Sequence, residues 1–238
     1  AMSANTTGSY STAVGAYSLA ANTTADANTA VGYEALNDNT TGGYNTGVGY
    51  QAMAVNTTGQ VNTALGWGAL VDNTTGDNNV AIGASALANN TSANDNTAVG
   101  KDALVTNTTG AQNVAIGKDA LDANTTASDN TAIGVGALGV NTTGASNVAV
   151  GNYSGDAITT GGSNTAIGYQ ALTSVTTASN NTAVGRESGK LATGQLNVYV
   201  GYEAGKNSTS GENSTFVGCY AASAATVTGH HNTGLGYQ

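Results

Sequence analysis

A 17-residue repeat runs along the whole chain and limits what it can fold into. Each copy carries a core of the form Asn-Thr-Ala-Val-Gly, closed by a glycine that recurs fourteen times in the 238 residues. These glycines are Gly15, Gly32, Gly49, Gly66, Gly83, Gly100, Gly117, Gly134, Gly151, Gly168, Gly185, Gly201, Gly218 and Gly236. A short fixed period is typical of a solenoid, in which each copy adds one turn to a stack. Such stacks act mainly through shape and surface, so the repeat favours a structural or binding role.

The composition leaves little material for a deep core. The chain has 34 Gly, one Phe, one Trp and no Pro. Val, Ile or Leu nevertheless precedes each of the fourteen glycines, and flexible Gly-rich linkers lack such a strict phase. A helical turn is disfavoured because Asn, Thr and Gly are poor helix formers and too few residues separate the glycines. We therefore predict an all-β parallel β-solenoid of fourteen turns, with residues 1–238 as a single continuous repeat array.

The residues before each glycine predict a short strand. In the copy at 28–44, side chains alternate, so Thr29 and Val31 share one face and Ala30 takes the other. Because the fourth position is always Val, Ile or Leu, we predict that its face points into the core. The predicted core ladder consists of Val31, Val48, Leu65, Ile82, Val99, Ile116 and Ile133.

Three further columns of the repeat carry structural predictions. The turn glycines Gly32, Gly49, Gly66, Gly83 and Gly100 are expected to adopt positive φ. Leu36 and its equivalents form a second apolar spot. The Asn that opens each copy and the Asn of Asn-Thr-Thr recur on successive turns, and stacked Asn amides can hydrogen-bond along a solenoid. We therefore interpret these Asn residues as structural ladders rather than as a ligand site.

The third strand position and the C-terminal turns depart from the rest. The third position is almost always Ala or Gly, which suggests a close approach by another surface such as a second chain; Tyr199 and Phe216 are the exceptions. In the variant turns at 186–238, Gly189, Gly205 and Ala222 replace the Leu of the repeat. The interior must narrow there or be filled in a different way.

The repeat cores resemble those of known fibrous proteins. Asn79-Val80-Ala81-Ile82-Gly83 resembles the head repeats of trimeric autotransporter adhesins, and the segment from Asn164 to Leu172 is similar to repeats of phage tail-fibre proteins. The resemblance covers the whole chain and implies a left-handed β-roll in each chain of a homotrimer. A thin core independently favours some association, since each fully buried apolar side chain contributes only about 1.5–3 kcal/mol.

Charge and residue patterns argue against several function classes. The net charge is −9 with only five Lys and Arg, so there is no basic stripe for nucleic acid. No apolar run approaches the roughly 20 residues of a membrane span, so no membrane insertion is expected. No Ser-His-Asp arrangement or recurring carboxylate pair indicates an enzyme, and no cofactor is implied. His230 and His231 are interpreted as a solvated turn rather than a metal site.

The position after each glycine is the candidate binding surface. It varies widely, which indicates exposure, and Tyr33, Tyr50 and Trp67 occupy it on three successive turns. Aromatic rings can pack on sugars, so this strip is a candidate site for carbohydrate or a cell-surface receptor. The alternative is a surface ladder that only stabilises neighbouring turns.

We expect a non-enzymatic structural fibre or adhesin segment that is extracellular, on a cell surface or on a virion. Two alternatives stay open: a shaft or receptor-binding segment of a phage tail fibre, and an ice-binding solenoid that uses Thr arrays such as Thr40-Thr41. Joining Gln238 to Ala1 preserves the 17-residue period, and neither end carries a polar cap. This predicts a segment of a longer fibre whose ends meet neighbouring turns.

Overall fold

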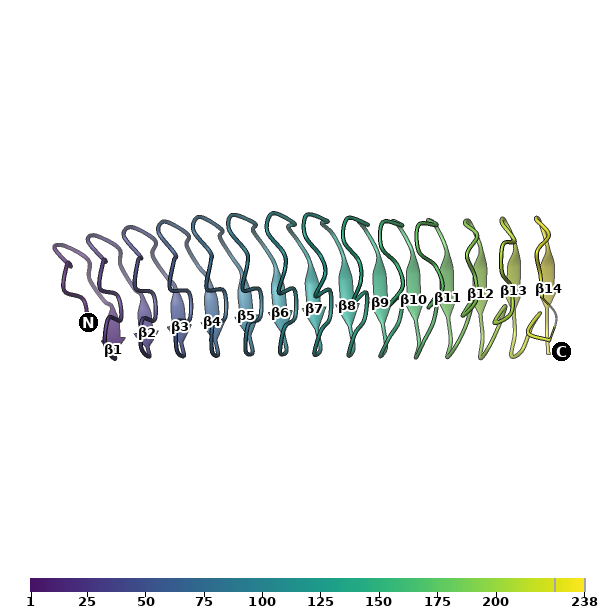
Figure 1. Cartoon of the computed structure of the whole chain (residues 1–238), viewed down its shortest axis with the longest axis horizontal. Coiled ribbons are helices and arrows are strands. Elements are labelled where there is room, and N and C mark those ends of the chain that lie inside the picture. The colour runs from purple at the N-terminus through teal and green to yellow at the C-terminus, as the bar shows by residue number, and fades with distance from the viewer. Residues whose placement is uncertain (225, 238) are drawn as a thin grey trace. The chain divides into compact units, whose positions relative to one another are not determined.

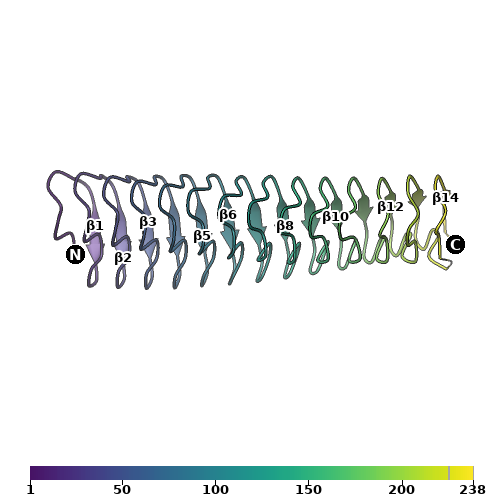
Figure 2. The same ribbon diagram turned by 45° about the horizontal axis from the view of Figure 1, so that its top comes forward.

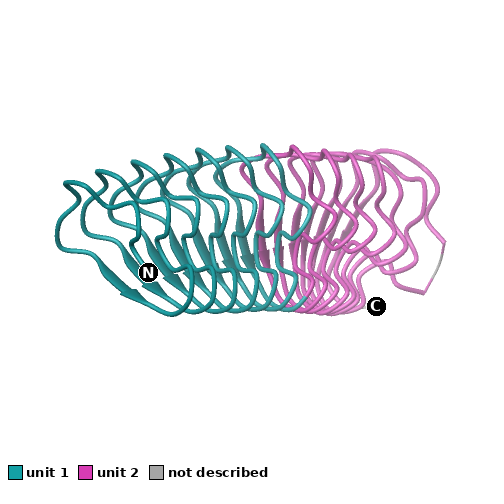
Figure 3. Cartoon of the chain, turned by 60° about the vertical axis from the view of Figure 1, so that its left-hand side comes forward, with its two compact units in different colours: residues 1–118 teal, residues 119–238 magenta. Residues whose placement is uncertain are grey.

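The computed structural model describes residues 1–224 and 226–237 as a parallel β-solenoid, with one short strand in each repeat (Figures 1 and 2). This confirms the predicted all-β solenoid and its period of about 17 residues. The chain divides into two compact units, residues 1–118 and residues 119–238 (Figure 3). Each unit contains seven of the strands.

All strands are three residues long and pair in parallel with their sequence neighbours inside each unit. Unit 1 contains β1 (Thr12–Val14), β2 (Thr29–Val31), β3 (Thr46–Val48), β4 (Thr63–Leu65), β5 (Val80–Ile82), β6 (Thr97–Val99) and β7 (Val114–Ile116). Unit 2 contains β8 (Thr131–Ile133), β9 (Val148–Val150), β10 (Thr165–Ile167), β11 (Thr182–Val184), β12 (Val198–Val200), β13 (Thr215–Val217) and β14 (Thr233–Leu235). Equivalent residues stand opposite each other, as where Val31 pairs with Val48. The repeat therefore sets the register.

The glycine after each strand is required by the backbone, as predicted. Gly32, Gly49, Gly66, Gly83 and Gly100 have φ values of 142°, 140°, 138°, 133° and 136°. A Cβ added at Gly83 would lie 2.6 Å from the carbonyl oxygen of Gly100 on the next turn. Both the left-handed conformation and the close approach of the next turn exclude a side chain here.

The prediction for the two strand faces was wrong, because it reversed inside and outside. The third position, such as Ala30 or Ala98, is fully buried, while the fourth position is partly exposed. In the predicted core ladder, Leu65 is 47% exposed, and Ile116 and Ile133 are also exposed but to a smaller degree. The other four members are half-buried: Val31, Val48, Ile82 and Val99. The Ala and Gly of the third position therefore face the interior of their own chain and not a second chain.

The reason for this reversal is the buried Leu or Met that lies four residues after the glycine in the regular turns. Leu36 lies at a corner with φ 50°, and its side chain is fully buried. A Cβ added at Gly47, in the third position of β3, would lie 3.2 Å from Cγ of Leu36. Only a small residue fits opposite this column, so the larger Val, Ile and Leu side chains must turn outward.

The two predicted Asn ladders are present and complete the interior. In one, the backbone N–H of Asn45 donates to Oδ1 of Asn28 at 2.9 Å, and Nδ2 of Asn45 donates to the carbonyl oxygen of Gly59 at 2.8 Å. In the other, Nδ2 of Asn56 donates to Oδ1 of Asn39 at 2.7 Å. All these side chains are fully buried. The amides therefore supply hydrogen bonds along each ladder and across each turn.

The Asn-Thr-Thr segment is a bend and not a second strand. The hydroxyl of its first Thr donates to the next turn, as from Oγ1 of Thr40 to the carbonyl of Thr57 at 2.9 Å. The second Thr, such as Thr41, is exposed. One hydroxyl of each pair is thus used within the solenoid and the other faces solvent.

Aromatic residues fill the interior of the variant turns. Tyr199, in the third position of β12, is fully buried, and Phe216 of β13 is nearly so, with ring centroids 6.0 Å apart. A Cβ added at Gly189 would lie 2.5 Å from Cδ2 of Tyr199, and one at Gly205 would overlap the other edge of the same ring. The ring therefore takes the space that Leu fills elsewhere.

Candidate functional surfaces

The outward face of the strands is a uniform, uncharged surface in each unit. It carries two columns, Thr or Val at the second position and Val, Ile or Leu at the fourth, with no charged residue in either. In unit 1 the most exposed members are Val14, Leu65 and Ile116, at 57%, 47% and 39%. Seven strands spaced about 4.8 Å apart, each rising about 3.3 Å per residue, give a face of about 330 Å² per unit. The largest apolar patch on an ordinary monomer has a similar area of about 300–600 Å² and is often functional.

The predicted aromatic strip is exposed, but its rings are turned toward each other. Tyr33, Tyr50 and Trp67 are 41%, 46% and 59% exposed. The rings of Tyr33 and Tyr50 stack with centroids 5.4 Å apart and 12° between their planes, and Tyr17 packs edge-on against Tyr33 at 5.8 Å. Stacking thus covers one face of Tyr33 and one face of Tyr50, whereas no ring contact involves Trp67 within the described residues. This geometry favours the interpretation of the strip as a ladder that joins neighbouring turns.

The pKa of the Tyr33 phenol is raised by its hydrogen bond to Glu34 and by the negative charge of that carboxylate. Glu34 also accepts a hydrogen bond from Nε2 of Gln51 on the next turn at 2.7 Å. The Tyr33 phenol therefore stays neutral at ordinary pH, beside the polar side chains of Glu34 and Gln51.

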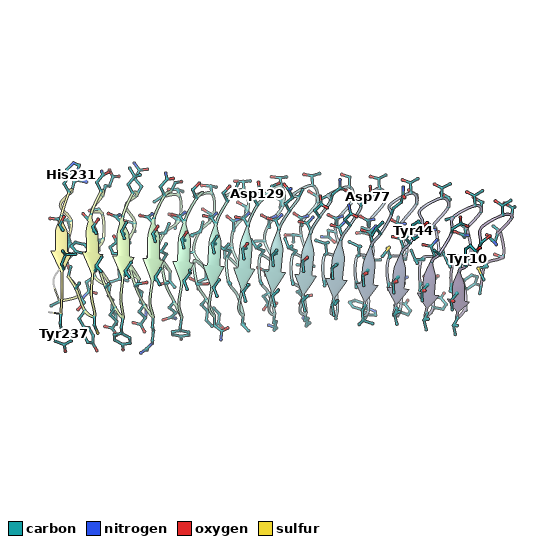
Figure 4. All side chains as sticks on the ribbon, turned by 180° about the vertical axis from the view of Figure 1, so that it is seen from behind. Tyr10, Tyr44, Asp77, Asp129, His231 and Tyr237 are labelled. Carbon is teal, nitrogen blue, oxygen red and sulfur yellow. The ribbon has the colours of Figure 1, made fainter. Side chains whose placement is uncertain are left out.

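A second corner lies two residues before each strand and in unit 1 carries the two most exposed aromatic side chains. Tyr10 and Tyr44 are 92% and 66% exposed, and Val61 is 53% exposed. All three have left-handed backbones, with φ values of 59°, 61° and 58°. Figure 4 shows Tyr10 and Tyr44 beside the starts of β1 and β3. The sequence pattern alone did not identify these residues as candidates. The feature that could have identified them is the large side chains in a column that is otherwise rich in turn-forming residues.

A charge cluster occupies the variant turns of unit 2. The Glu187 carboxylate is nearly buried and contacts Nζ of Lys206 at 2.7 Å, Nη2 of Arg186 at 3.0 Å and Nζ of Lys190 at 3.5 Å. The hydrogen bond from Lys206 lowers the pKa of Glu187, and the same contact raises the pKa of Lys206. Glu203 adds a second carboxylate 3.2 Å from Lys206. With three cations around two carboxylates, each of these side chains has a partner of opposite charge, which suits a structural role.

Arg186 connects this cluster to the aromatic column of unit 2. Its guanidinium carbon lies 5.8 Å from the ring centre of Tyr169 and 5.5 Å from that of Tyr202. Its Nη1 also donates to the hydroxyl of Tyr202 at 2.9 Å. The cation lies between a ring on the turn before its own and a ring on the turn after it, and its contact with both holds the column together.

The two histidines lie at the last turn of unit 2. Nδ1 of His230 is 4.0 Å from a carboxylate oxygen of Glu212 and accepts a hydrogen bond from its backbone N–H, while His231 holds the left-handed corner. Within residues 1–224 and 226–237, no three His, Cys, Asp or Glu side chains come together in a way that would hold a metal ion. The same residues contain no helix with the length and hydrophobicity of a membrane span.

Comparison of the chain with protein-family models, curated proteins and solved structures gave no match. The resemblance to adhesin head repeats and phage tail-fibre repeats therefore stays a prediction. The parallel β-solenoid of 17-residue turns, with its two Asn ladders, rests on the structure itself.

Proposed function

We propose that the chain is a segment of a rigid extracellular or virion fibre that associates with copies of itself and presents repeated surface contacts. The observation that carries this proposal is the uncharged outward face of the strands. Such a face exposes Val, Ile and Leu while the Ala residues are buried, which is the reverse of what a solitary soluble sheet needs. Self-association would remove this surface from water.

The size of the face supports association between copies of the chain. If the faces of both units are covered, each partner contributes about 660 Å², which is at the lower end of the roughly 600–1,000 Å² per partner of a standard stable interface. The second and fourth strand positions each form a column with one residue per turn. The same columns on a second copy have the same spacing, so the side chains of two copies can pack turn by turn. We propose a homotrimer, which follows from the resemblance to adhesin head repeats, with contacts made by Val, Ile, Leu and Thr rather than by the small residues of the third position.

The mass of the assembly in solution tests this proposal. We expect sedimentation velocity at micromolar concentration to give three times the 23.2 kDa of one chain. Replacing Val48 and Val99 by Lys puts charges on the outward face and should reduce the mass to that of the monomer. The matched control is Thr41→Lys/Thr58→Lys. These two residues are exposed but lie outside the strands, so this variant should keep the wild-type mass. A wild-type chain that stays a stable monomer would contradict the proposal.

Ice binding is a second candidate, supported by one surface of unit 1. The exposed second Thr of each Asn-Thr-Thr recurs once per turn, at Thr7, Thr24, Thr41, Thr58 and Thr75. A regular column of exposed hydroxyls and methyls is the feature that such a function needs. Thermal hysteresis measured on the wild type, and lost in the Thr41→Lys/Thr58→Lys variant, would favour this candidate; its absence would remove it.

A further inference from the structure

We propose that the corner of unit 1 carrying Tyr10 and Tyr44 binds a neutral sugar chain through the faces of the two tyrosine rings. The proposal rests on the proposed function as a surface-contact segment, and it names the class of ligand that this surface would take. It concerns a different surface from the strip at Tyr33, Tyr50 and Trp67.

The backbone at this corner gives the first argument. The column in unit 1 consists of Tyr10, Ala27, Tyr44, Val61, Asn78, Asp95 and Gln112, and each of these residues has positive φ. Asn and Asp tolerate this conformation, whereas a bulky side chain destabilises it. Of the two other left-handed columns, burial offsets that cost at Leu36, and the bulky Tyr17 of the second column packs its ring against Tyr33. Tyr10 and Tyr44 are mostly exposed, so local stability does not account for them, and residues of this kind are typical of ligand contacts.

The ring faces give the second argument. Within the described residues, no other aromatic ring contacts Tyr10 or Tyr44, in contrast to the stacked pair Tyr33 and Tyr50. Tyr10 and Tyr44 are two turns apart, or about 9.6 Å, with the small Ala27 on the turn between them. The apolar face of a pyranose ring packs on an aromatic ring face, and two such contacts at this spacing suit a chain about two sugars long.

The polar groups beside the rings define the ligand further. Asp26 and Gln60 are exposed next to this corner. One carboxylate oxygen of Asp26 accepts the backbone N–H of Ser9 at 2.7 Å, and the other has no hydrogen bond within the described part of the chain. That oxygen can accept a hydrogen bond from a sugar hydroxyl. Because the nearby ionisable groups include Asp26 and Asp77 and no cation, an acidic sugar is disfavoured and a neutral one fits.

The corner is held in place by the solenoid. Each hydrogen bond here runs from a backbone N–H to a backbone carbonyl oxygen of the preceding turn. The pairs are Ala27 to Ser9 at 2.9 Å, Tyr44 to Asp26 at 3.1 Å, and Val61 to Gly43 at 3.1 Å. These hydrogen bonds join successive turns, so the rings stand on a fixed base. A preorganised surface loses little conformational entropy when a ligand binds.

Titration calorimetry of the full chain with neutral hexasaccharides tests the proposal. The probes are cellohexaose, maltohexaose and chitohexaose, with polygalacturonate as the acidic comparison. We expect at least one neutral probe to bind, and the Tyr10→Asn/Tyr44→Asn variant to bind it at least about tenfold more weakly. Asn suits the left-handed corner, as at Asn78, so this variant should fold.

The matched control is Tyr33→Ala/Tyr50→Ala, which removes the stacked pair and should change the affinity by less than about twofold. The proposal is overturned if no neutral hexasaccharide binds, if polygalacturonate binds more tightly than the neutral probes, or if the two double variants lose affinity equally. Sedimentation of the same variants separates this result from the proposed function. A wild-type monomer that binds sugar through Tyr10 and Tyr44 would contradict the trimer and support this site.

Discussion

The regular turns of unit 1 and the variant turns around β12 solve one packing problem with different residues. In unit 1 a buried Leu or Met at the corner, such as Leu87, faces a small residue on the strand. Around β12 the corner residues are Gly189 and Gly205, and Tyr199 enters from the strand and lies against both. What the turns share is the volume between strand and corner. One large residue must fill it, and either wall can supply that residue.

The polar interior changes together with the apolar one. In unit 1 the Asn of Asn-Thr-Thr continues without interruption, whereas in unit 2 it stops at Asn141 and is followed by Ile158, Val175, Ala192 and Ser208. Tyr199 donates its hydroxyl to Oγ of Ser208 at 3.2 Å, and burial raises the pKa of the phenol. The buried ring thus requires a polar partner on the opposite wall, and Ser208 supplies it.

The largest expected effect comes from forcing the variant solution onto a regular turn. Ala98→Tyr places a ring against the filled corner column of unit 1, and we expect it to reduce the free energy of unfolding by more than about 5 kcal/mol. Val99→Tyr, one residue further along β6, points outward and should cost less than about 2 kcal/mol. Urea unfolding followed by circular dichroism measures both. Equal losses in the two variants would contradict the assignment of the two strand faces.

This pair of variants also shows where sequence reasoning reached its limit. The period, the strands, the glycine turns and the Asn ladders all followed from the repeat. Alternation along a strand separates two faces but does not say which one is inside. The larger side chain of Val31 suggested that its face was the buried one. The better indicator of the buried face was the neighbouring position of Ala30, which is almost always a small residue. The corner Leu36 occupies the interior first, and that contact across the turn is not visible in a single repeat.

The sequence identified the variant turns by their loss of Leu, but it did not show that Tyr199 fills the space that Leu leaves. Tyr199 stands ten residues after Gly189 and six before Gly205, so no local pattern joins the three. Their relation becomes evident only when successive turns are stacked. The exposed corner at Tyr10 and Tyr44 was overlooked for a similar reason, since positive φ at a non-glycine residue has little signal in sequence.

The second prediction removes the ring that fills the variant turns. Tyr199→Ala leaves a cavity beside Gly189 and Gly205, and we expect it to cost about 3–5 kcal/mol. Adding Gly189→Leu should restore part of this loss, because Gly189 has φ 56° and the equivalent Leu172 has φ 52°. Thermal unfolding of the single and double variants measures the recovery. A double variant no more stable than Tyr199→Ala alone would show that the two residues do not share one space.

The third prediction compares a paired carboxylate of unit 2 with one of unit 1. Glu187→Gln removes the partner of Lys206 and Arg186, and we expect a loss of about 1–2 kcal/mol at pH 7, since both cations are partly exposed. Glu34→Gln in unit 1 keeps its contact with Gln51 and should cost less than about 0.5 kcal/mol.

The pH dependence of this loss has a defined sign. Lys206 holds the pKa of Glu187 below its usual value, so the stabilisation is present above the ordinary glutamate pKa of about 4.3 and disappears as pH falls through the lower value in the folded chain. Stability curves for wild type and Glu187→Gln should therefore converge in acid. A difference that persists unchanged at pH 2 would mean that the charge has no part in it.

The smallest effect distinguishes the middle of an Asn ladder from its end. In unit 1, Nδ2 of Asn73 donates to Oδ1 of Asn56 at 2.8 Å, and Oδ1 of Asn73 accepts from Asn90 at 2.8 Å. In unit 2, Nδ2 of Asn141 donates to the carbonyl oxygen of Gly144 at 2.9 Å, but its Oδ1 is buried and has no hydrogen-bond partner among the described residues. The next turn carries Ile158 at that place, which has no donor.

Removing the two amides should therefore have unequal consequences. Asn73→Ala removes a hydrogen-bond partner from Oδ1 of Asn56 on one neighbouring turn and from Nδ2 of Asn90 on the other. Asn141→Ala, by contrast, removes an oxygen that was buried and unsatisfied, and this offsets part of its cost. We expect both variants to be destabilised, and Asn73→Ala to lose about 1 kcal/mol more than Asn141→Ala. Urea unfolding of the two variants in parallel gives the difference. If Asn141→Ala were the more damaging, the end of the ladder would have to be stabilised by a group other than the next Asn.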